Sequence, residues 1–235
     1  PPETSVMNTF YDAQNFLEKD EKVLILFIDG FGYHQYFKAI NNGYAPFLKS
    51  LPLANKATTV YKCVTNAGFA AMITGKSPEE NGVYSRAQRE LKVPSIFALA
   101  RDLGKSSVLI EGDIKILNTE IEPILNLDTN NSGTTDEEVF ETSIYSLDKN
   151  HDLIMVHFHG VDDMGHNEGD LDEKTMERIA LADDYIKELA INWKGKIIIT
   201  SDHGMHSTDT GGDHGSFLYQ DMIVPYLLIE GGDGQ

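Results

Sequence analysis

The amino-acid sequence predicts an α/β fold, a three-layer sandwich whose mostly parallel central sheet is covered by helices on both faces. Short apolar runs rich in β-branched residues recur along the 235 residues, which is typical of strands buried on both sides. Segments with a helical spacing of apolar residues lie between these runs. This alternation of strands and helices favours βαβ units, which build a parallel sheet.

Five apolar runs are the predicted strands of this sheet. Four of them read as buried parallel strands, and they cover residues 22–30, 106–111, 153–158 and 196–200. The fifth run, 223–229, contains Pro225, which has no backbone N–H to donate to a neighbouring strand. We therefore expect the fifth strand to lie at an edge of the sheet or to bend.

The clearest predicted helix follows Asp172, which is a suitable N-cap residue. Its apolar residues recur at spacings of three and four and form one stripe, namely Met176, Ile179, Ala182, Ile186, Leu189 and Trp193. Residues 94–103 and 137–147 also suit helices, and residues 45–51 suit a short one. The polar stretch 126–138 is interpreted as a loop or a lid.

Composition bounds the class of protein. Hydrophobic residues make up 41% of the chain and charged residues 24%, which is typical of a folded, soluble domain. We expect a single domain over residues 1–235, because no repeat or long linker divides the chain. No apolar run is long enough to span a membrane. The chain starts with Pro1 and Pro2 rather than Met, which is consistent with a trimmed start and leaves the compartment open.

Charge and cysteine content exclude several functions. The formal net charge of −18 argues against a nucleic-acid polymer or an anionic membrane face as a partner, because an acidic surface repels phosphate groups. The single cysteine, Cys63, excludes an intramolecular disulfide framework and a cysteine-based zinc site. The oligomeric state is left open by these features.

Residues that can bind metal ions follow three of the predicted strands. Asp29 ends the first strand, where it is either a ligand or a simple turn residue. Asp162 and His166 follow the 153–158 strand, and we expect Gly165 to allow a sharp bend that turns both toward one point. The alternative for this second segment is a solvated polar loop.

The third segment follows the 196–200 strand and contains Asp202 and His203, with His214 eleven residues beyond His203. Six of the eight histidines lie in the second and third segments, and histidine with carboxylate is the ligand set of Zn²⁺, Mn²⁺ or Fe²⁺. Because strands of a parallel sheet end at one edge, we expect these ligands to meet there.

Thr65 is the candidate nucleophile beside such a site. It precedes a predicted helix that runs to about Ile73, and a helix N-terminus attracts an anionic phosphate oxygen. A metal ion on its hydroxyl lowers the pKa of that hydroxyl and produces a nucleophile. The alternative is that Thr65 only caps the helix, with Asn66 beside it.

Together these residues resemble the alkaline phosphatase superfamily. Asp162 to His166 match its D-x-x-G-H element, the 201–205 segment matches S-D-H-G-M, and His214 matches a late His-Gly pair. A threonine nucleophile resembles the type I phosphodiesterase/nucleotide pyrophosphatase branch, although the histidine segments also resemble ethanolamine phosphate transferases. The resemblance implies an alkaline phosphatase-like core and a covalent intermediate on Thr65.

The resemblance also implies two divalent metal ions, for which we expect Zn²⁺, with Mn²⁺ as the alternative. One ion is expected at the ligand set that binds Thr65, and the other is expected at a second ligand set. The first set is Asp29, Asp202 and His203, and the second is Asp162, His166 and His214. A small-molecule phosphate ester is the implied substrate. The short chain leaves no room for the large cap insertion that many members carry.

Two features separate this chain from the branch pattern, its short length and the segment after the nucleophile. The branch usually has an asparagine three residues after the nucleophile, where this chain has Gly68, so either Asn66 is the contact to the phosphoryl oxygen or that contact is absent. No arginine lies near a ligand segment in the sequence, which favours a diester over a dianionic monoester. Phosphomonoester hydrolysis, phosphoethanolamine-type transfer and a non-catalytic metal-binding module remain the alternatives.

Overall fold

A computed structural model describes residues 3–232, so Pro1 and Pro2, which the sequence analysis marked as a trimmed start, lie outside the described residues. The strands are β1 (Glu3–Ser5), β2 (Val23–Ile28), β3 (Asn55–Thr58), β4 (Ser107–Glu111), β5 (Ile124–Leu125), β6 (Leu153–Phe158), β7 (Lys196–Thr200), β8 (His206–Thr208), β9 (Gly211–Asp213) and β10 (Ile223–Glu230). The helices are α1 (Asn8–Glu18), α2 (Tyr33–Asn41), α3 (Pro46–Ser50), α4 (Thr65–Thr74), α5 (Pro78–Asn81), α6 (Ile96–Asp102), α7 (Asp136–Leu147), α8 (Gly160–Glu168), α9 (Glu173–Asn192) and α10 (Tyr219–Met222).

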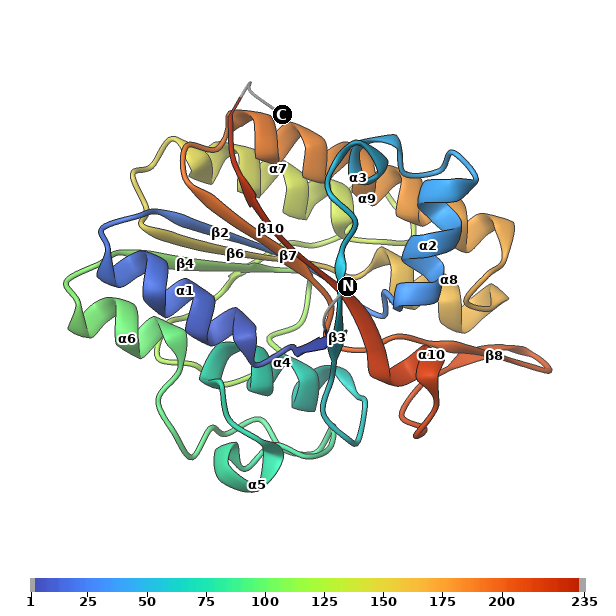
Figure 1. The fold of residues 1–235 in the computed structure, drawn as a ribbon, viewed down its shortest axis with the longest axis horizontal. Helices are drawn as coiled ribbons and strands as arrows, with labels where there is room; N and C mark the ends of the chain where they lie inside the picture. The colour runs from blue at the N-terminus through green and yellow to red at the C-terminus, as the bar shows by residue number, and fades with distance from the viewer. Residues whose placement is uncertain (1–2, 233–235) are drawn as a thin grey trace.

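Eight of the described strands form one sheet in the order β1-β3-β10-β7-β2-β6-β4-β5. The pairs β7-β2, β2-β6, β6-β4 and β4-β5 are parallel, whereas β10 is antiparallel to both β3 and β7. Helices cover both faces, which confirms the predicted α/β sandwich (Figure 1). Among the described residues, no helix combines the length and the apolar character needed to cross a membrane.

The alternation of side chains along β2 divides the core into two layers. Leu24, Leu26 and Ile28 pack against α2, α3, α7 and α9 on one face, in a cluster that includes the predicted α9 stripe. Val23, Ile25 and Phe27 pack against α1, α4 and α6 on the other face. Every residue of β2 is buried, because helices lie above and below it.

The fifth predicted strand is not an edge strand, so the first of the two alternatives expected from Pro225 is wrong. β10 lies inside the sheet, where residues 223–226 pair with β3 and residues 227–230 pair with β7. This register places Pro225 beyond the last paired residue of β7, Ile199. The proline is tolerated because no β7 carbonyl requires its missing N–H at that position.

The bend expected at Gly165 is also wrong. Residues 160–168 form the helix α8, so Asp162 and His166 come together as an i,i+4 pair on one helix face. Asp136 of α7 stabilises the start of this helix, because its carboxylate accepts hydrogen bonds from the N–H groups of His159 and Gly160. Gly165 serves close packing instead, since a Cβ there would lie 2.3 Å from the Met205 sulfur.

Candidate metal centre

The candidate residues gather at the carboxyl ends of three neighbouring strands. Asp29 directly follows β2, Asp202 and His203 follow β7, and α8 begins directly after β6. Helix α4 covers one face of the sheet, and its first residue, Thr65, lies at the same edge. The strand order β7-β2-β6 explains the convergence, because parallel neighbours end side by side.

Asp29, Asp202 and His203 form the first ligand group. All three side chains are buried, and their ligand atoms lie within 4.8 Å of one another. His203 Nε2 is 3.3 Å from Asp29 Oδ1 and 3.2 Å from Asp202 Oδ2. The Thr65 hydroxyl oxygen lies 3.4 Å from Asp29 Oδ1 and 3.3 Å from His203 Nε2. The structure thus brings the candidate nucleophile to the group that the resemblance assigned to it.

The second ligand group is centred on Asp162. Its Oδ1 lies 3.6 Å from His214 Nε2, and its Oδ2 lies 3.4 Å from His166 Nε2. The compact group of three at this place is Asp162, His203 and His214, and the described residues also contain a compact group of Asp29, His157 and His159. His203 thus stands between the two groups, whereas His166 approaches Asp162 from the far end of α8 and lies outside the compact groups found among the described residues.

The imidazole rings are oriented as metal ligands are. The Nδ1 atoms of His203, His166 and His214 lie 2.7, 3.0 and 2.8 Å from the carbonyl oxygens of Gly204, Gly212 and Cys63. A carbonyl oxygen only accepts hydrogen bonds, so each neutral ring carries its proton on Nδ1 and presents the Nε2 lone pair to the carboxylates.

Two buried oxygens lack a partner at the same place. Asp202 Oδ2 and Asp162 Oδ1 are buried without a hydrogen bond. A buried carboxylate oxygen with no donor is costly, and a cation supplies the missing interaction. The donor set of carboxylate oxygens and imidazole nitrogens suits zinc and manganese. The residues present therefore fit the metal ions that the family resemblance implies.

The pKa values of the ligands reflect crowded negative charge. Burial raises the pKa of Asp202 well above its usual range, and the neighbouring Asp29 carboxylate raises it further. Burial alone would lower the pKa of His203, but Asp202 and Asp29 outweigh it and raise the value to about 10. Burial and the neighbouring His203 lower the pKa of His214 to about 4, so this ring is neutral at pH 7.

An arginine lies at the second group, which corrects the expectation that none does. Arg86 Nη2 is 3.0 Å from His214 Nε2, although the two residues are 128 positions apart. Lys62 lines the same cavity of about 390 Å³ with Arg86 and His214. Nothing in the sequence predicted this contact, because Arg86 lies in the irregular segment between α5 and α6, far from every ligand motif.

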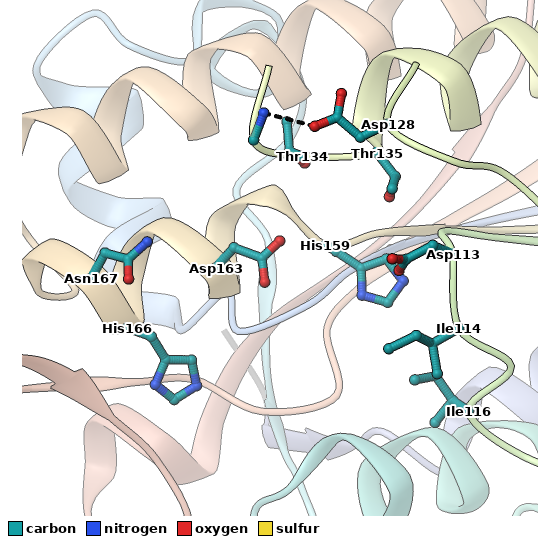
Figure 2. A pocket seen from close by; sticks show the side chains of 11 residues that line it. Asp113, Ile114, Ile116, Asp128, Thr134, Thr135, His159, Asp163, His166 and Asn167 are labelled. Carbon is teal, nitrogen blue, oxygen red and sulfur yellow. Dashed lines mark hydrogen bonds between the residues drawn. The ribbon is translucent and has the colours of Figure 1, made fainter. Parts of the chain in front are cut away.

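A larger cavity of about 570 Å³ borders the second group on its other side. Figure 2 shows His159, Asp163 and His166 along one wall, with Ile114 and Ile116 facing them. Four residues of the predicted loop or lid also line this cavity, namely Asp128, Gly133, Thr134 and Thr135. The cavity is large enough for the part of a small substrate that lies beyond the reacting group.

The start of α4 explains the glycine that departs from the branch pattern. A Cβ at Gly68 would lie 2.3 Å from the backbone oxygen of Asp202, so no side chain fits at that position. Asn66 is buried and donates its amide hydrogen bond to the Gln88 carbonyl, 3.0 Å away. Val64 is the N-cap residue of α4, and its side chain makes no capping hydrogen bond. Thr65 is therefore the first residue of the helix.

One further residue, Glu111, was not predicted from the sequence. His157 was predicted either to orient a metal ligand or to be a core residue. His157 Nε2 lies 2.8 Å from Asp29 Oδ2, and its Nδ1 lies 3.4 Å from Glu111 Oε1. Glu111 ends an apolar strand, and a charged residue at that place was the available signal. Strand order cannot be read from local sequence patterns, so the neighbour of Glu111 could not be predicted.

A sequence profile of the type I phosphodiesterase / nucleotide pyrophosphatase family matches residues 23–224. No curated protein sequence matches the chain. Many solved structures are similar in fold, three of which follow. Phosphonoacetate hydrolase from Sinorhizobium meliloti 1021, in complex with phosphonoformate, is 18% identical with a TM-score of 0.60, over 79% of this chain and 57% of that one.

The other two similar structures come from mouse and from Escherichia coli. Murine ectonucleotide pyrophosphatase / phosphodiesterase 5 is 20% identical with a TM-score of 0.61, over 80% of this chain and 58% of that one. The C-terminal periplasmic domain of EcEptC is 16% identical with a TM-score of 0.62, over 90% and 73%. The chain therefore spans less than two thirds of the first two structures. These likenesses support the alkaline phosphatase-like core.

Proposed function

The chain belongs to the type I phosphodiesterase / nucleotide pyrophosphatase family, and from this membership we propose that it is a metal-dependent hydrolase of small-molecule phosphate esters. One observation carries the proposal. The Thr65 hydroxyl lies within 3.4 Å of Asp29 and 3.3 Å of His203, which belong to a buried ligand group with an unpartnered carboxylate oxygen.

Two sets of residues are proposed to hold two divalent ions. Asp29, Asp202 and His203 hold the first, together with the Thr65 hydroxyl, and Asp162, His166 and His214 hold the second. Zinc is the proposed metal because imidazole and carboxylate form its usual ligand set, with Mn²⁺ as the alternative. Bound there, such ions supply Lewis acidity that lowers the pKa of a hydroxyl and stabilises charge on phosphoryl and leaving oxygens.

Thr65 is the proposed nucleophile. Its oxygen forms a bond to phosphorus while the bond to the ester oxygen breaks, and the alcohol leaves with a proton. Water then attacks the phosphorus of the phospho-threonine and restores the hydroxyl. The uncapped N–H groups at the start of α4 attract the non-bridging phosphoryl oxygens. We propose that Asn66 supports this site indirectly, because its amide holds the Gln88 carbonyl near Arg86.

We favour a diester substrate because of the family, with a phosphomonoester as the second candidate. Arg86 favours the monoester, since a guanidinium beside His214 suits the additional charge of a dianionic phosphoryl group. Transfer of the phosphoryl group to another alcohol uses the same residues. We also propose that residues 1–235 act as one catalytic domain without a large cap insertion, because the long described helices pack on one central sheet.

Turnover of a chromogenic phosphodiester by the zinc-loaded protein tests the proposal. We expect Thr65→Ala to reduce kcat at least about 1,000-fold, as loss of a covalent nucleophile does, and Thr65→Ser to retain measurable activity. Thr74→Ala, at the other end of α4, is the matched control and should leave kcat unchanged. If the zinc-loaded wild type shows no turnover while Thr65→Ala binds zinc normally, the chain is a metal-binding module instead.

A further inference from the structure

Glu111 and His157 are wholly buried titratable side chains to which the proposed mechanism assigns no role. They lie at the carboxyl ends of adjacent strands, β4 and β6, on the face of the sheet that α4 covers. We propose that His157 and Glu111 are positioning residues that hold the Asp29 carboxylate with one chosen oxygen toward Thr65. This inference deepens the proposed function and rests on Asp29 being a ligand of the catalytic metal.

The two carboxylate oxygens of Asp29 contact different residues in the structure. Oδ2 lies 2.8 Å from His157 Nε2, whereas Oδ1 lies 3.4 Å from the Thr65 hydroxyl and 3.3 Å from His203 Nε2. The final torsion of an aspartate side chain is broad, so an unrestrained carboxylate samples several orientations. A hydrogen bond from His157 to Oδ2 removes this freedom and directs Oδ1 to the site.

The His157 ring is itself held on every side. It stacks on Phe27 with a centroid distance of 3.9 Å and an interplanar angle of 7°, and His159 lies on it at 3.7 Å. Glu111 Oε1 lies 3.4 Å from Nδ1, and Glu111 Oε2 accepts a hydrogen bond from the Ile116 N–H. Both ring nitrogens therefore face carboxylate oxygens, and the short 2.8 Å approach of Nε2 to Asp29 Oδ2 is that of a hydrogen-bond donor, although Asp29, His157 and His159 also form a compact group of possible metal ligands.

The three residues lie on or directly after three strands that are neighbours in the sheet. The register pairs Phe27 of β2 with His157 of β6, and Glu111 follows the β4 residue that pairs with Val156. Asp29, His157 and Glu111 thus form one buried line that runs across β2, β6 and β4 to the ligand group. Burying a carboxylate and an imidazole inside a sheet is costly, and apolar residues would serve packing better. The site explains why polar residues occupy this line.

Three variants of the full chain separate positioning from packing. His157→Phe keeps a ring that stacks on Phe27 but donates no hydrogen bond. His157→Gln keeps an N–H near the position of Nε2, and Glu111→Gln removes the carboxylate behind the ring. Asp183→Asn is the matched control, because Asp183 is another buried carboxylate, on the opposite face, where it binds the N–H groups of Phe47 and Leu48.

The primary measurement is zinc affinity, by competition with a chromophoric chelator, beside thermal unfolding of the metal-free proteins. We expect His157→Phe to weaken zinc binding about 10–100-fold and Glu111→Gln about tenfold, as loss of an orienting hydrogen bond does. His157→Gln should recover most of the affinity. Asp183→Asn should unfold at a lower temperature yet bind zinc as the wild type does. If His157→Phe fails to fold, Glu111→Gln and His157→Gln decide the question.

Steady-state kinetics supply the second readout. A displaced Asp29 should lower kcat in His157→Phe and leave KM nearly unchanged, because His157 does not contact the substrate. Wild-type zinc affinity in both His157→Phe and Glu111→Gln would overturn the positioning role, even if the wild type is an active hydrolase. Conversely, reduced zinc affinity in these variants beside an inactive zinc-loaded wild type would support the positioning role and reject the proposed function.

Discussion

Asp202→Asn should stabilise the metal-free protein and destabilise the zinc-loaded one. Asp202 is wholly buried, and its Oδ1 accepts hydrogen bonds from the N–H groups of Gly30 and His203 and from the Ser201 hydroxyl. Its Oδ2 has no hydrogen bond. The amide of asparagine keeps the oxygen that accepts these bonds and replaces the orphaned oxygen with an uncharged donor.

The size of the effect follows from the orphaned oxygen. A buried polar atom without a hydrogen bond costs about 1–3 kcal/mol, but His203 Nε2 lies 3.2 Å from this oxygen and partly offsets that cost, so the metal-free variant should gain at most about 2 kcal/mol. For a chain of this length that gain raises Tm by about 4–8 °C. In zinc at about 1,000 times the wild-type Kd, the wild type gains about 4 kcal/mol; a 100-fold weaker variant gains only about 1.4 kcal/mol. The order of stability therefore reverses.

The pH dependence of the metal-free difference provides a further check. Burial and Asp29 raise the pKa of Asp202 in the folded state, so the folded protein binds a proton more tightly than the unfolded chain. The contribution of Asp202 to wild-type stability is then fully present below the unfolded pKa of about 3.9 and is lost as the pH rises through the folded pKa. The advantage of Asp202→Asn should accordingly be larger at pH 8 than at pH 5.

The assay is thermal unfolding by circular dichroism, in chelator and in zinc, for both proteins. A variant that is less stable than the wild type under both conditions would refute the reasoning, because Asp202 would then act as a structural hydrogen-bond group only. A variant that zinc stabilises as strongly as it stabilises the wild type would remove Asp202 from the metal ligands.

Three further predictions concern neighbouring residues. Arg86→Ala should lower kcat/KM for a phosphomonoester about 100-fold but for a diester only a few-fold. The reason is that a charge-assisted hydrogen bond contributes about 1.5–3 kcal/mol. Equal losses of kcat/KM for the two substrates would contradict a charge-specific role of Arg86. Zinc binding at pH 7.5 should release at least about one proton, because the His203 pKa is raised to about 10 in the metal-free site and the Asp202 pKa is raised as well; calorimetry in buffers of different ionisation enthalpy measures this, and no release would contradict it. Gly68→Ala should destabilise the fold by at least about 1–3 kcal/mol and weaken zinc binding, because its Cβ would lie 2.3 Å from the Asp202 carbonyl; an unchanged Tm would show that α4 moves freely.

The fold class and the main candidate residues followed from local sequence. β2, β4, β6, β7 and α9 were predicted nearly to their ends, because each combines an apolar run with a polar residue that stops it. Asp29 and Asp202 were found by the same logic, since a carboxylate directly after a buried strand lies at the edge of the sheet. The short strands β1 and β3 and the helix α8 were missed because their local patterns are weak.

Tertiary structure decided the contacts between distant segments. The His214 ring meets Arg86 across 128 residues, and Glu111 meets His157 across 46, because strand order and loop packing bring them together. β10 could not be placed from Pro225, since tolerance for a proline depends on which strand lies beside it. The amino-acid sequence by itself determined which chemical groups stand at the ends of the strands. Which of them face one another was decided only when the sheet assembled, because the pairing order depends on the packing of the whole chain.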